Sequence, residues 1–532
     1  MSQMNIEHDV EKRDFGIGQP PENYMTTIDL EKSNSLNHEL PPTSRQTSPG
    51  STENVATDIT MPLNWPVWKK IINMGVPSIA SAVVTFGSSV CAPAIPDLMH
   101  DFHVSETVAI LPLTTYVLGL AFGPMISAPL SETLGRLGTY RTAIPISALF
   151  SLGAGYAPNL GALCVLRFFA GAFGGAVIPV CAGTAADIFS PQHFAVAGAW
   201  LLYFPALGPA IGPVVGSYVT DSGWRWSQYT LAIASAVSYL PVFFLEETYA
   251  KIILARRFQK QQERSPSSTT DAQTDIPPKP PAKTILFTIL FITLLRPAKM
   301  LVTEPIVAFL SIYVAFSFAV HFTFFASVPY VFAHVYGFDR GETGLVFLAI
   351  CGGCTLVLPT AILLDKWVYQ KQWKLSPGCV EPEHRLWVAM MGAVGLPVGL
   401  FWFAWSARHG VHWIVPTLSM VPFAWGNLCI YVSPLDTFLS SHTDTNEIGT
   451  AMYLLDTYAA LTAASAIAAN GLLRYIMGAT FPLFTTAMYE RLGIAWATSL
   501  LGFVTLAMLP IPWVLYQWGP KIRAASKFET KG

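Results

Sequence analysis

The feature that most constrains this chain is a series of long apolar segments between Ile71 and Tyr516. Each has about 20 residues, enough for an α-helix to cross a hydrocarbon core about 30 Å thick. Lipid offers the backbone no hydrogen-bond partners, so a helix is the structure available to each segment. We count twelve spans, at residues 71–92, 107–129, 140–157, 160–183, 195–220, 227–245, 305–328, 341–364, 386–405, 413–434, 449–473 and 492–516.

The composition agrees with an all-α integral membrane protein. Of the 532 residues, 52% are hydrophobic and 12% are charged, whereas soluble domains carry about 25% charged residues. The formal net charge of -2 provides no basic surface for nucleic acid, and we expect no nucleic-acid partner.

The distribution of basic residues predicts the orientation. Most of the 31 Lys and Arg residues fall in the two terminal segments and in alternate loops, and cytoplasmic loops are the ones enriched in these residues. We therefore expect both termini to be cytoplasmic.

The longest loop divides the twelve spans into two sets of six. We predict a disordered cytoplasmic tail (1–68), an N-terminal six-helix bundle (69–247), a cytoplasmic central loop (248–303), a C-terminal six-helix bundle (304–518) and a short cytoplasmic tail (519–532). Two pseudo-symmetric halves are typical of secondary transporters.

Ionisable residues inside spans are costly, and each is a candidate functional residue. Asp456 is the most deeply embedded carboxylate and the first candidate for proton coupling; the alternatives are a helix–helix hydrogen bond or an interfacial position. Glu304 is the second, unless it only favours a helix N-terminus. Arg167 can stabilise a nearby carboxylate in its charged form, or it can be a structural arginine bonded to backbone carbonyls.

The fifth span has two interleaved four-residue periods. Gly208, Gly212 and Gly216 leave one ridge bare, while Pro209 and Pro213 remove backbone donors from the adjacent ridge. This pattern predicts a bent helix packed tightly against a neighbour.

Polar and aromatic residues within other spans are candidates for a substrate cavity, although packing is the alternative for each. They are His321, Phe325, Asn427, Tyr431 and Tyr453. His321 is also a candidate for gating by pH, with a structural histidine as the alternative.

Taken in order, several motifs resemble the major facilitator superfamily, and within it the fungal twelve-span drug:proton antiporters that include cycloheximide, azole and polyamine resistance transporters. The motifs are Gly123-Pro124 through Gly135-Arg136, the stretch around Arg167 and Gly171, Gly208 through Gly216, Glu247-Thr248-Tyr249-Ala250 and Glu304-Pro305. One departure is Ser217, where the fifth-span motif ends in a second glycine.

The resemblance implies two bundles that rock around a central cavity, with proton influx driving a small organic, amphipathic or hydrophobic substrate outward. It also implies that Glu132, Arg136 and Asp187 form a charge cluster at the inner gate. We expect a monomer in the plasma membrane, or alternatively in the vacuolar or another internal membrane, with no cofactor and no metal.

Other functions fit the sequence less well. One alternative is an importer or facilitator of a small organic nutrient, and the antiporter-type motif of the fifth span counts against it. A receptor or a membrane enzyme is disfavoured because the 11 histidines are dispersed and no nucleophile–base pair stands out.

Overall fold

The computed structural model describes residues 61–189, 194–250, 252–257, 296–364, 386–432 and 460–524, and every regular element within these ranges is helical. Helices occupy all six predicted spans of the N-terminal half: α3 (Val67–Phe86), α6 (Leu111–Leu134), α7 (Arg136–Gly155), α8 with α9 (Leu160–Gly175 and Val177–Ile188), α10 (Phe194–Val219) and α11 (Arg225–Tyr239).

Each of the six predicted spans of the C-terminal half contains a helix among the described residues. These helices are α15 (Pro305–Val331), α16 with α17 (Arg340–Val346 and Leu348–Leu364), α19 (Leu386–Ser406), α20 (Ile414–Val432), α22 (Ala460–Thr480) and α23 with α24 (Pro482–Met508 and Pro510–Ala524). In the described part of the chain, eight stretches are long and apolar enough to cross a membrane, and α3, α7, α11 and α22 occupy the other four predicted spans. The all-α membrane fold is confirmed.

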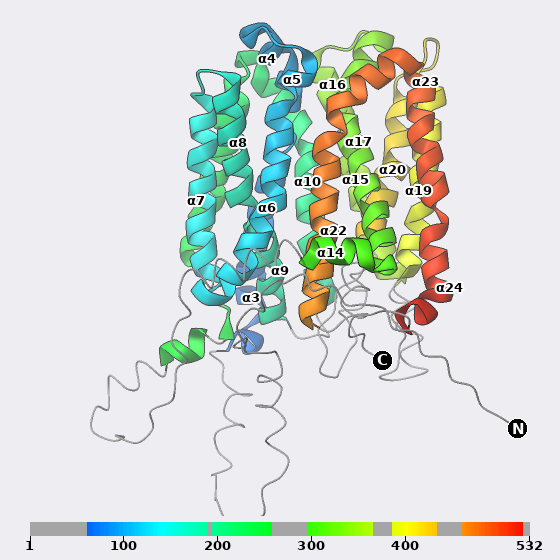
Figure 1. Cartoon of the computed structure of the whole chain (residues 1–532). Coiled ribbons are helices and arrows are strands. Elements are labelled where there is room, and N and C mark those ends of the chain that lie inside the picture. Colours follow the sequence, from blue (N-terminus) through cyan, green and yellow to red (C-terminus); the bar gives the residue numbers. More distant parts are fainter. Residues whose placement is uncertain are drawn as a thin grey trace, which may run out of the picture. The chain divides into compact units, whose positions relative to one another are not determined.

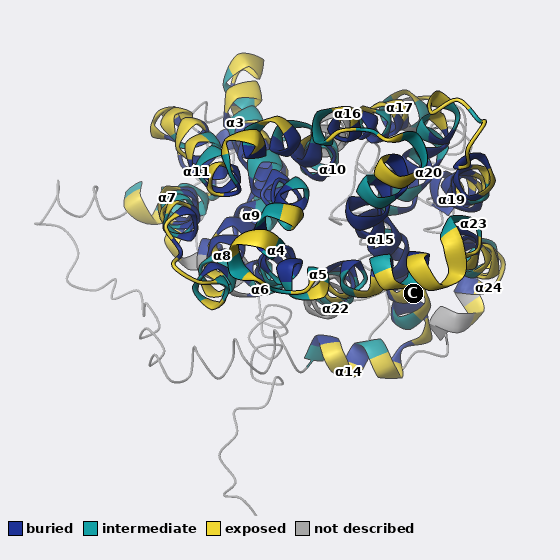
Figure 2. Ribbon diagram, turned by 90° about the horizontal axis from the view of Figure 1, so that it is seen from above, coloured by how far each residue is buried: buried dark blue, intermediate teal, exposed yellow. Residues whose placement is uncertain are grey.

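The helices form two groups that follow the order of the chain. Viewed from above, α3 and α6 to α11 lie together on one side, and α15 to α24 lie on the other (Figure 2). The groups meet where α10 packs on α16 and α17, and where α22 packs on α6. Helix α15 is buried along most of its length and contacts α20, α22 and α23.

Short helices lie at the two ends of the bundles (Figure 1). At the end predicted to face outside are α4 (Ile95–Phe102) and α5 (Glu106–Ala109). At the opposite end, α14 (Arg296–Thr303) falls within the predicted central loop. It buries Pro297 and Met300 against α15 and α22 and exposes the polar Lys299 and Thr303, the pattern of an interfacial amphipathic helix.

The end of the eleventh predicted span and the start of the twelfth differ from the structure. The predicted eleventh span ends at Leu473, next to a charged residue, but α22 continues to Thr480 and encloses Arg474. Helix α23 then begins at Pro482 and bends at Gly493, whose φ is +76°. The prediction was wrong here because a hydropathy window treats an arginine as a boundary, whereas surrounding aromatic rings allow Arg474 to be buried.

Candidate functional site

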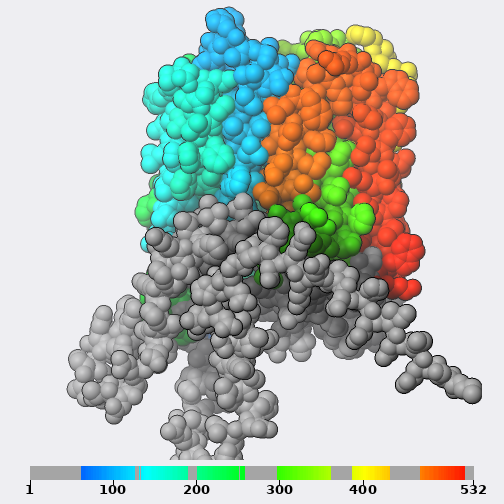
Figure 3. All heavy atoms as spheres, viewed as in Figure 1, coloured from blue at the N-terminus to red at the C-terminus, as the bar shows by residue number. Residues whose placement is uncertain are grey.

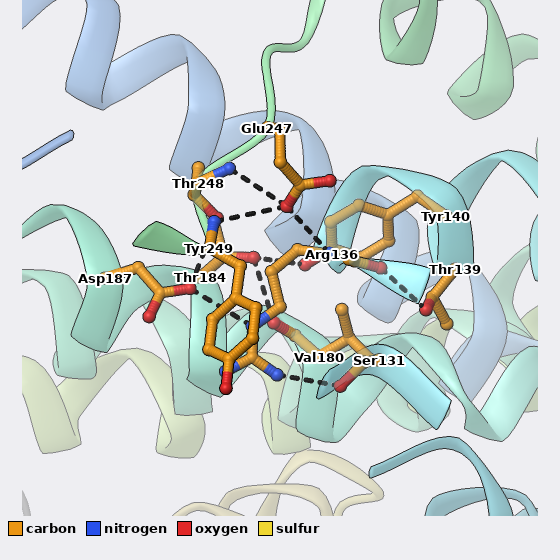
Figure 4. A network of polar contacts seen from close by, with 11 residues as sticks. Ser131, Arg136, Thr139, Tyr140, Val180, Thr184, Asp187, Glu247, Thr248 and Tyr249 are labelled. Carbon is orange, nitrogen blue, oxygen red and sulfur yellow. Dashed lines mark hydrogen bonds and ion pairs between the residues drawn. The ribbon is translucent and has the colours of Figure 1, made fainter. Parts of the chain in front are cut away.

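A polar network lies where α6 and α9 end and α7 begins (Figure 4). Arg136, the first residue of α7, donates from Nε to Oδ2 of Asp187 at 3.1 Å and from Nη1 to Oγ of Ser131 at 2.7 Å. Its guanidinium also lies 4.9 Å from the ring centroid of Tyr249. The Arg136 and Asp187 side chains are only 13% and 19% exposed, so the pair is largely shielded from water.

Glu247 completes the network from the segment after the sixth span. Its Oε1 accepts hydrogen bonds from the backbone N–H groups of Arg136 at 2.9 Å, Thr248 at 3.2 Å and Tyr249 at 3.1 Å. The carboxylate thereby caps the N-terminus of α7, where backbone donors and the helix dipole favour a negative charge. Thr248 in turn donates to Asp187 at 3.3 Å.

Two glycines make room for this network. Gly135 joins α6 to α7 with a φ of +92°, a conformation that few other residues adopt. On α9, a Cβ at Gly183 would lie 2.6 Å from Cζ of Arg136, so a side chain there would displace the guanidinium.

Of the predicted inner charge cluster, the structure brings Arg136 and Asp187 together. Glu132 belongs to α6, but its side chain lies outside the described residues. The hydrogen-bond partners of Arg136 described above, Ser131, Asp187 and Glu247, all belong to the N-terminal half, so the network braces that half. Sequence reasoning missed the role of Glu247; an acid directly after the sixth span, facing a helix that starts with arginine, was the available signal.

Arg167 lies on α8 and is completely buried. It donates to the carbonyl oxygens of Pro112 at 3.1 Å and Gly87 at 3.0 Å, and to Oε1 of Gln228 at 3.2 Å. Its guanidinium also lies 4.6 Å from the ring centroid of Tyr116. Arg167 forms no ion pair with a carboxylate of the described residues, and its neutral acceptors match the structural alternative.

Helix α10 packs its glycine ridge against the end of α3 and the turn that follows it, residues 87–91. A Cβ at Gly208 would meet Thr85, one at Gly212 would meet Ser89, and one at Gly216 would meet Val90. Ser89 also donates to the carbonyl oxygen of Pro209 at 2.9 Å. This carbonyl lacks its usual helical donor because the residue four positions on, Pro213, has no N–H.

The opposite side of α10 faces the C-terminal half. Ser217 lies against Gly344 of α16. A Cβ added at Gly344 would lie 2.8 Å from the Cβ of Ser217 and 3.0 Å from the carbonyl oxygen of Pro213. Tyr203 forms a hydrogen bond of 3.1 Å with Thr355 of α17. Helix α10 is therefore packed closely against helices of both halves.

The described cavity candidates lie on α15 and α20. His321 is buried among aromatic rings, 5.7 Å from Phe325 and 6.4 Å from Phe423 between centroids. Its Nδ1 has no hydrogen-bond partner among the described residues. Asn427 accepts a hydrogen bond from Ser317, which joins α20 to α15.

The remaining sequence candidates are spread along the chain. Tyr431 places its ring 4.5 Å from the guanidinium of Arg474, a residue that sequence reasoning left outside the candidate site. Glu304 is buried at the junction of α14 and α15. Asp456 and Tyr453 lie outside the described residues.

At the end predicted to face outside, polar contacts join the two halves. Arg340 of α16 forms a two-pronged ion pair with Asp97 of α4, at 2.7 Å and 2.9 Å. Thr486 of α23 donates to Glu106 of α5 at 2.7 Å. In Figure 3 the atoms of this N-terminal region lie directly against those of α22 and α23. Sequence analysis missed Asp97 and Arg340, since no local pattern pairs residues of different halves.

Two groups of membrane-spanning helices that follow the order of the chain and pack against each other are the architecture of a secondary transporter. The family model of the Major Facilitator Superfamily matches residues 78–467, and the chain belongs to this family. It is a multi-pass secondary transporter and not an enzyme.

Relatives and a solved structure agree with this assignment. The chain is 36% identical to Polyamine transporter 4 of Saccharomyces cerevisiae, over 88% of this chain and 71% of that protein. It is also 36% identical to the MFS-type efflux pump MFS2 of Trichophyton rubrum, over 93% and 80%. The proton:xylose symporter XylE, bound to 6-bromo-6-deoxy-D-glucose, shares the fold with a TM-score of 0.58 and 14% identity, over 85% of this chain and 96% of that chain.

Proposed function

We propose that this protein is a proton-coupled antiporter that exports small organic molecules, such as drugs, toxins or secondary metabolites, by alternating access. Small organic substrates are the cargo of its family, and a relative that is an efflux pump supports the outward direction. The proposed location is the plasma membrane, with both termini in the cytoplasm.

The observation that carries the proposal is the packing of α10. This helix combines a glycine ridge against α3 with contacts to α16 and α17. A helix held closely by both halves transmits any change in their relative position, and its prolines leave sites where it can bend.

Export requires that protonation change the relative stability of the two access states. We propose Asp456 as the residue that takes up the proton, with Glu304 as the second candidate. Arg167 holds α8 to the carbonyl oxygens of two other segments and is proposed to couple this helix to the movement. The network of Arg136 and Asp187 is proposed to stabilise the inner gate in the access state in which that gate is closed.

The test uses inside-out vesicles that contain the full-length protein and have an acidic interior. The labelled panel contains cycloheximide, an azole and 2-naphthoate, with spermidine measured beside them. We expect at least one of the first three to accumulate when the proton gradient is present and to leave when an uncoupler is added. If neither these compounds nor any member of a wider panel of metabolites accumulated, export by antiport would be contradicted. Accumulation that survives the uncoupler would contradict proton coupling.

A substitution then tests the coupling residue. Asp456→Asn should abolish gradient-driven accumulation but leave exchange of labelled for unlabelled substrate, because exchange needs no net proton movement. Asp221→Asn, at an exposed position, is the matched control. Normal accumulation by Asp456→Asn would remove this residue from the coupling role.

A further inference from the structure

We infer that Arg474 and Asn470 form an anion-binding site for the carboxylate of a transported molecule. The inference rests on the proposed export function and specifies its substrate class. Arg474 lies on α22 and is 9% exposed. Three aromatic rings surround its guanidinium, with centroids 5.0 Å away for Phe318 on α15, 4.5 Å for Tyr431 on α20 and 4.6 Å for Tyr475.

The hydrogen-bonding capacity of this site is incomplete. Among the described residues, Nε of Arg474 and Nδ2 of Asn470 are buried and lack a hydrogen-bond partner. The two residues are four positions apart on α22, so their side chains lie on the same helix face, one turn from each other. Both open atoms are donors, which means that the missing group is an acceptor.

Arg167 provides an internal comparison. Both arginines are deeply buried in the membrane-spanning helices, but Arg167 donates to three acceptors and Arg474 is surrounded by rings. No carboxylate of the described residues forms an ion pair with Arg474, and the groups that hydrogen-bond to it there are the hydroxyls of Tyr431 and Tyr475. Because a buried charge without a counter-charge is unfavourable, this arrangement favours the binding of an anion.

The geometry specifies the chemical class of this anion. A guanidinium presents parallel N–H groups that match the two oxygens of a carboxylate, and Asn470 supplies a further donor. The rings of Phe318, Tyr431 and Tyr475 provide an apolar surface for the rest of the molecule. An aromatic or amphipathic carboxylic acid fits this combination, whereas a polyamine would be repelled by the buried cation.

Binding to the purified full-length protein tests this inference separately from transport. The probes are matched pairs of aromatic carboxylic acids and their carboxamides, beginning with 2-naphthoate and 2-naphthamide, at a pH where the acids are ionised; spermidine is measured beside them. We expect wild-type protein to bind the carboxylates at least tenfold more tightly than the carboxamides. Arg474→Gln should abolish this preference while the affinity for the carboxamides stays the same.

Further variants exclude a general loss of structure. Asn470→Ala should weaken carboxylate binding and Arg474→Lys should retain part of it, while Arg408→Gln, at an exposed position, should bind as wild type does. A panel without any carboxylate preference, preferential binding of spermidine, or an unchanged preference in Arg474→Gln would overturn the inference. Binding of 2-naphthoate without gradient-driven accumulation of the same compound in the inside-out vesicles would instead contradict the export function alone.

Discussion

At the scale of single residues, this protein uses buried charges in different ways. Arg167 is held by neutral acceptors, Arg136 is paired with Asp187, and Arg474 is enclosed by aromatic rings. A charge in a low-dielectric interior is tolerated only with compensating partners. The kind of partner therefore separates structural arginines from those that remain open for a ligand or a conformational change.

The Arg136–Asp187 pair gives a prediction at this scale. Arg136→Gln should lower transport at least about tenfold while the protein still reaches the membrane, because hydrogen bonds to a charged partner contribute about 1.5–3 kcal/mol. Asp187→Asn should act through the same interaction, so the double variant should lose less than the product of the single effects. Substrate efflux from cells measures this.

The matched control is Arg141→Gln, which removes an exposed arginine from the same helix. It should transport at the wild-type rate. Strictly multiplicative losses in the double variant would show that Arg136 and Asp187 act independently, contrary to this prediction.

At the scale of the elements, α10 is the helix whose sequence most directly predicts its packing. Its glycine period forecast a close approach to a neighbour, and the structure identifies that neighbour as α3. The departure at Ser217 also has a physical counterpart, because the hydroxyl-bearing side chain fits against a glycine of α16. The contact between α10 and α16 thus pairs a serine on one helix with a glycine on the other.

Gly212→Ala tests the packing of α10. The new Cβ would meet Ser89 and lie 3.0 Å from the backbone nitrogen of Val90, so we expect a loss of about 1–3 kcal/mol in stability from overpacking. Thermal unfolding of the purified protein, followed by its loss of monodispersity, measures the effect. Ser89→Ala in the same chain should restore part of the stability.

Gly352→Ala is the control, since a Cβ on this α17 glycine has no neighbour within 4 Å. It should be neutral or slightly stabilising, because alanine favours helix over glycine. An equal loss of stability in both variants would show that the effect is not due to the α3–α10 contact.

At the scale of the whole molecule, the contacts between the halves at the outer end bear on alternating access. Asp97 and Arg340 come from opposite halves and form an ion pair about 30% exposed on each side, so it is accessible but partly shielded. Thr114 adds a hydrogen bond of 2.9 Å to the carbonyl oxygen of Ala479. Opening toward the outside requires these contacts to separate.

Arg340→Gln should therefore favour the outward-open state. An ion pair of about 1 kcal/mol shifts a two-state equilibrium by roughly fivefold. The measurement is the labelling rate of Ala479→Cys by a membrane-impermeant maleimide in intact cells, because Ala479 is fully buried between the halves in this structure. Asp97→Asn should raise the rate similarly.

Background labelling is measured in the chain without the added cysteine, and Arg408→Gln is the control for loss of an exposed outer arginine. An unchanged labelling rate in both Arg340→Gln and Asp97→Asn would show that the pair does not hold the outer end closed.

Much of the fold followed from the sequence because lipid restricts the backbone to helices and apolar length sets where they lie. The twelve spans and the division into halves needed no tertiary information. The candidate site was less accessible: Arg136 and Asp187 were grouped from their positions at helix ends, whereas Glu247 and Arg474 were not. Glu247 accepts a backbone hydrogen bond from a segment far away in the chain. Arg474 was placed just after the predicted eleventh span, whereas α22 includes it.

The sequence by itself determined the class of protein, because hydropathy, basic-residue bias and helix motifs are local properties of the chain. Only the tertiary structure decided which charges are compensated. That Arg167 meets carbonyl oxygens, that Arg340 meets Asp97 and that Arg474 meets aromatic rings depends on the rotation and packing of helices far apart in the chain. Helix rotation arises from many side-chain contacts at once, and no local pattern encodes it.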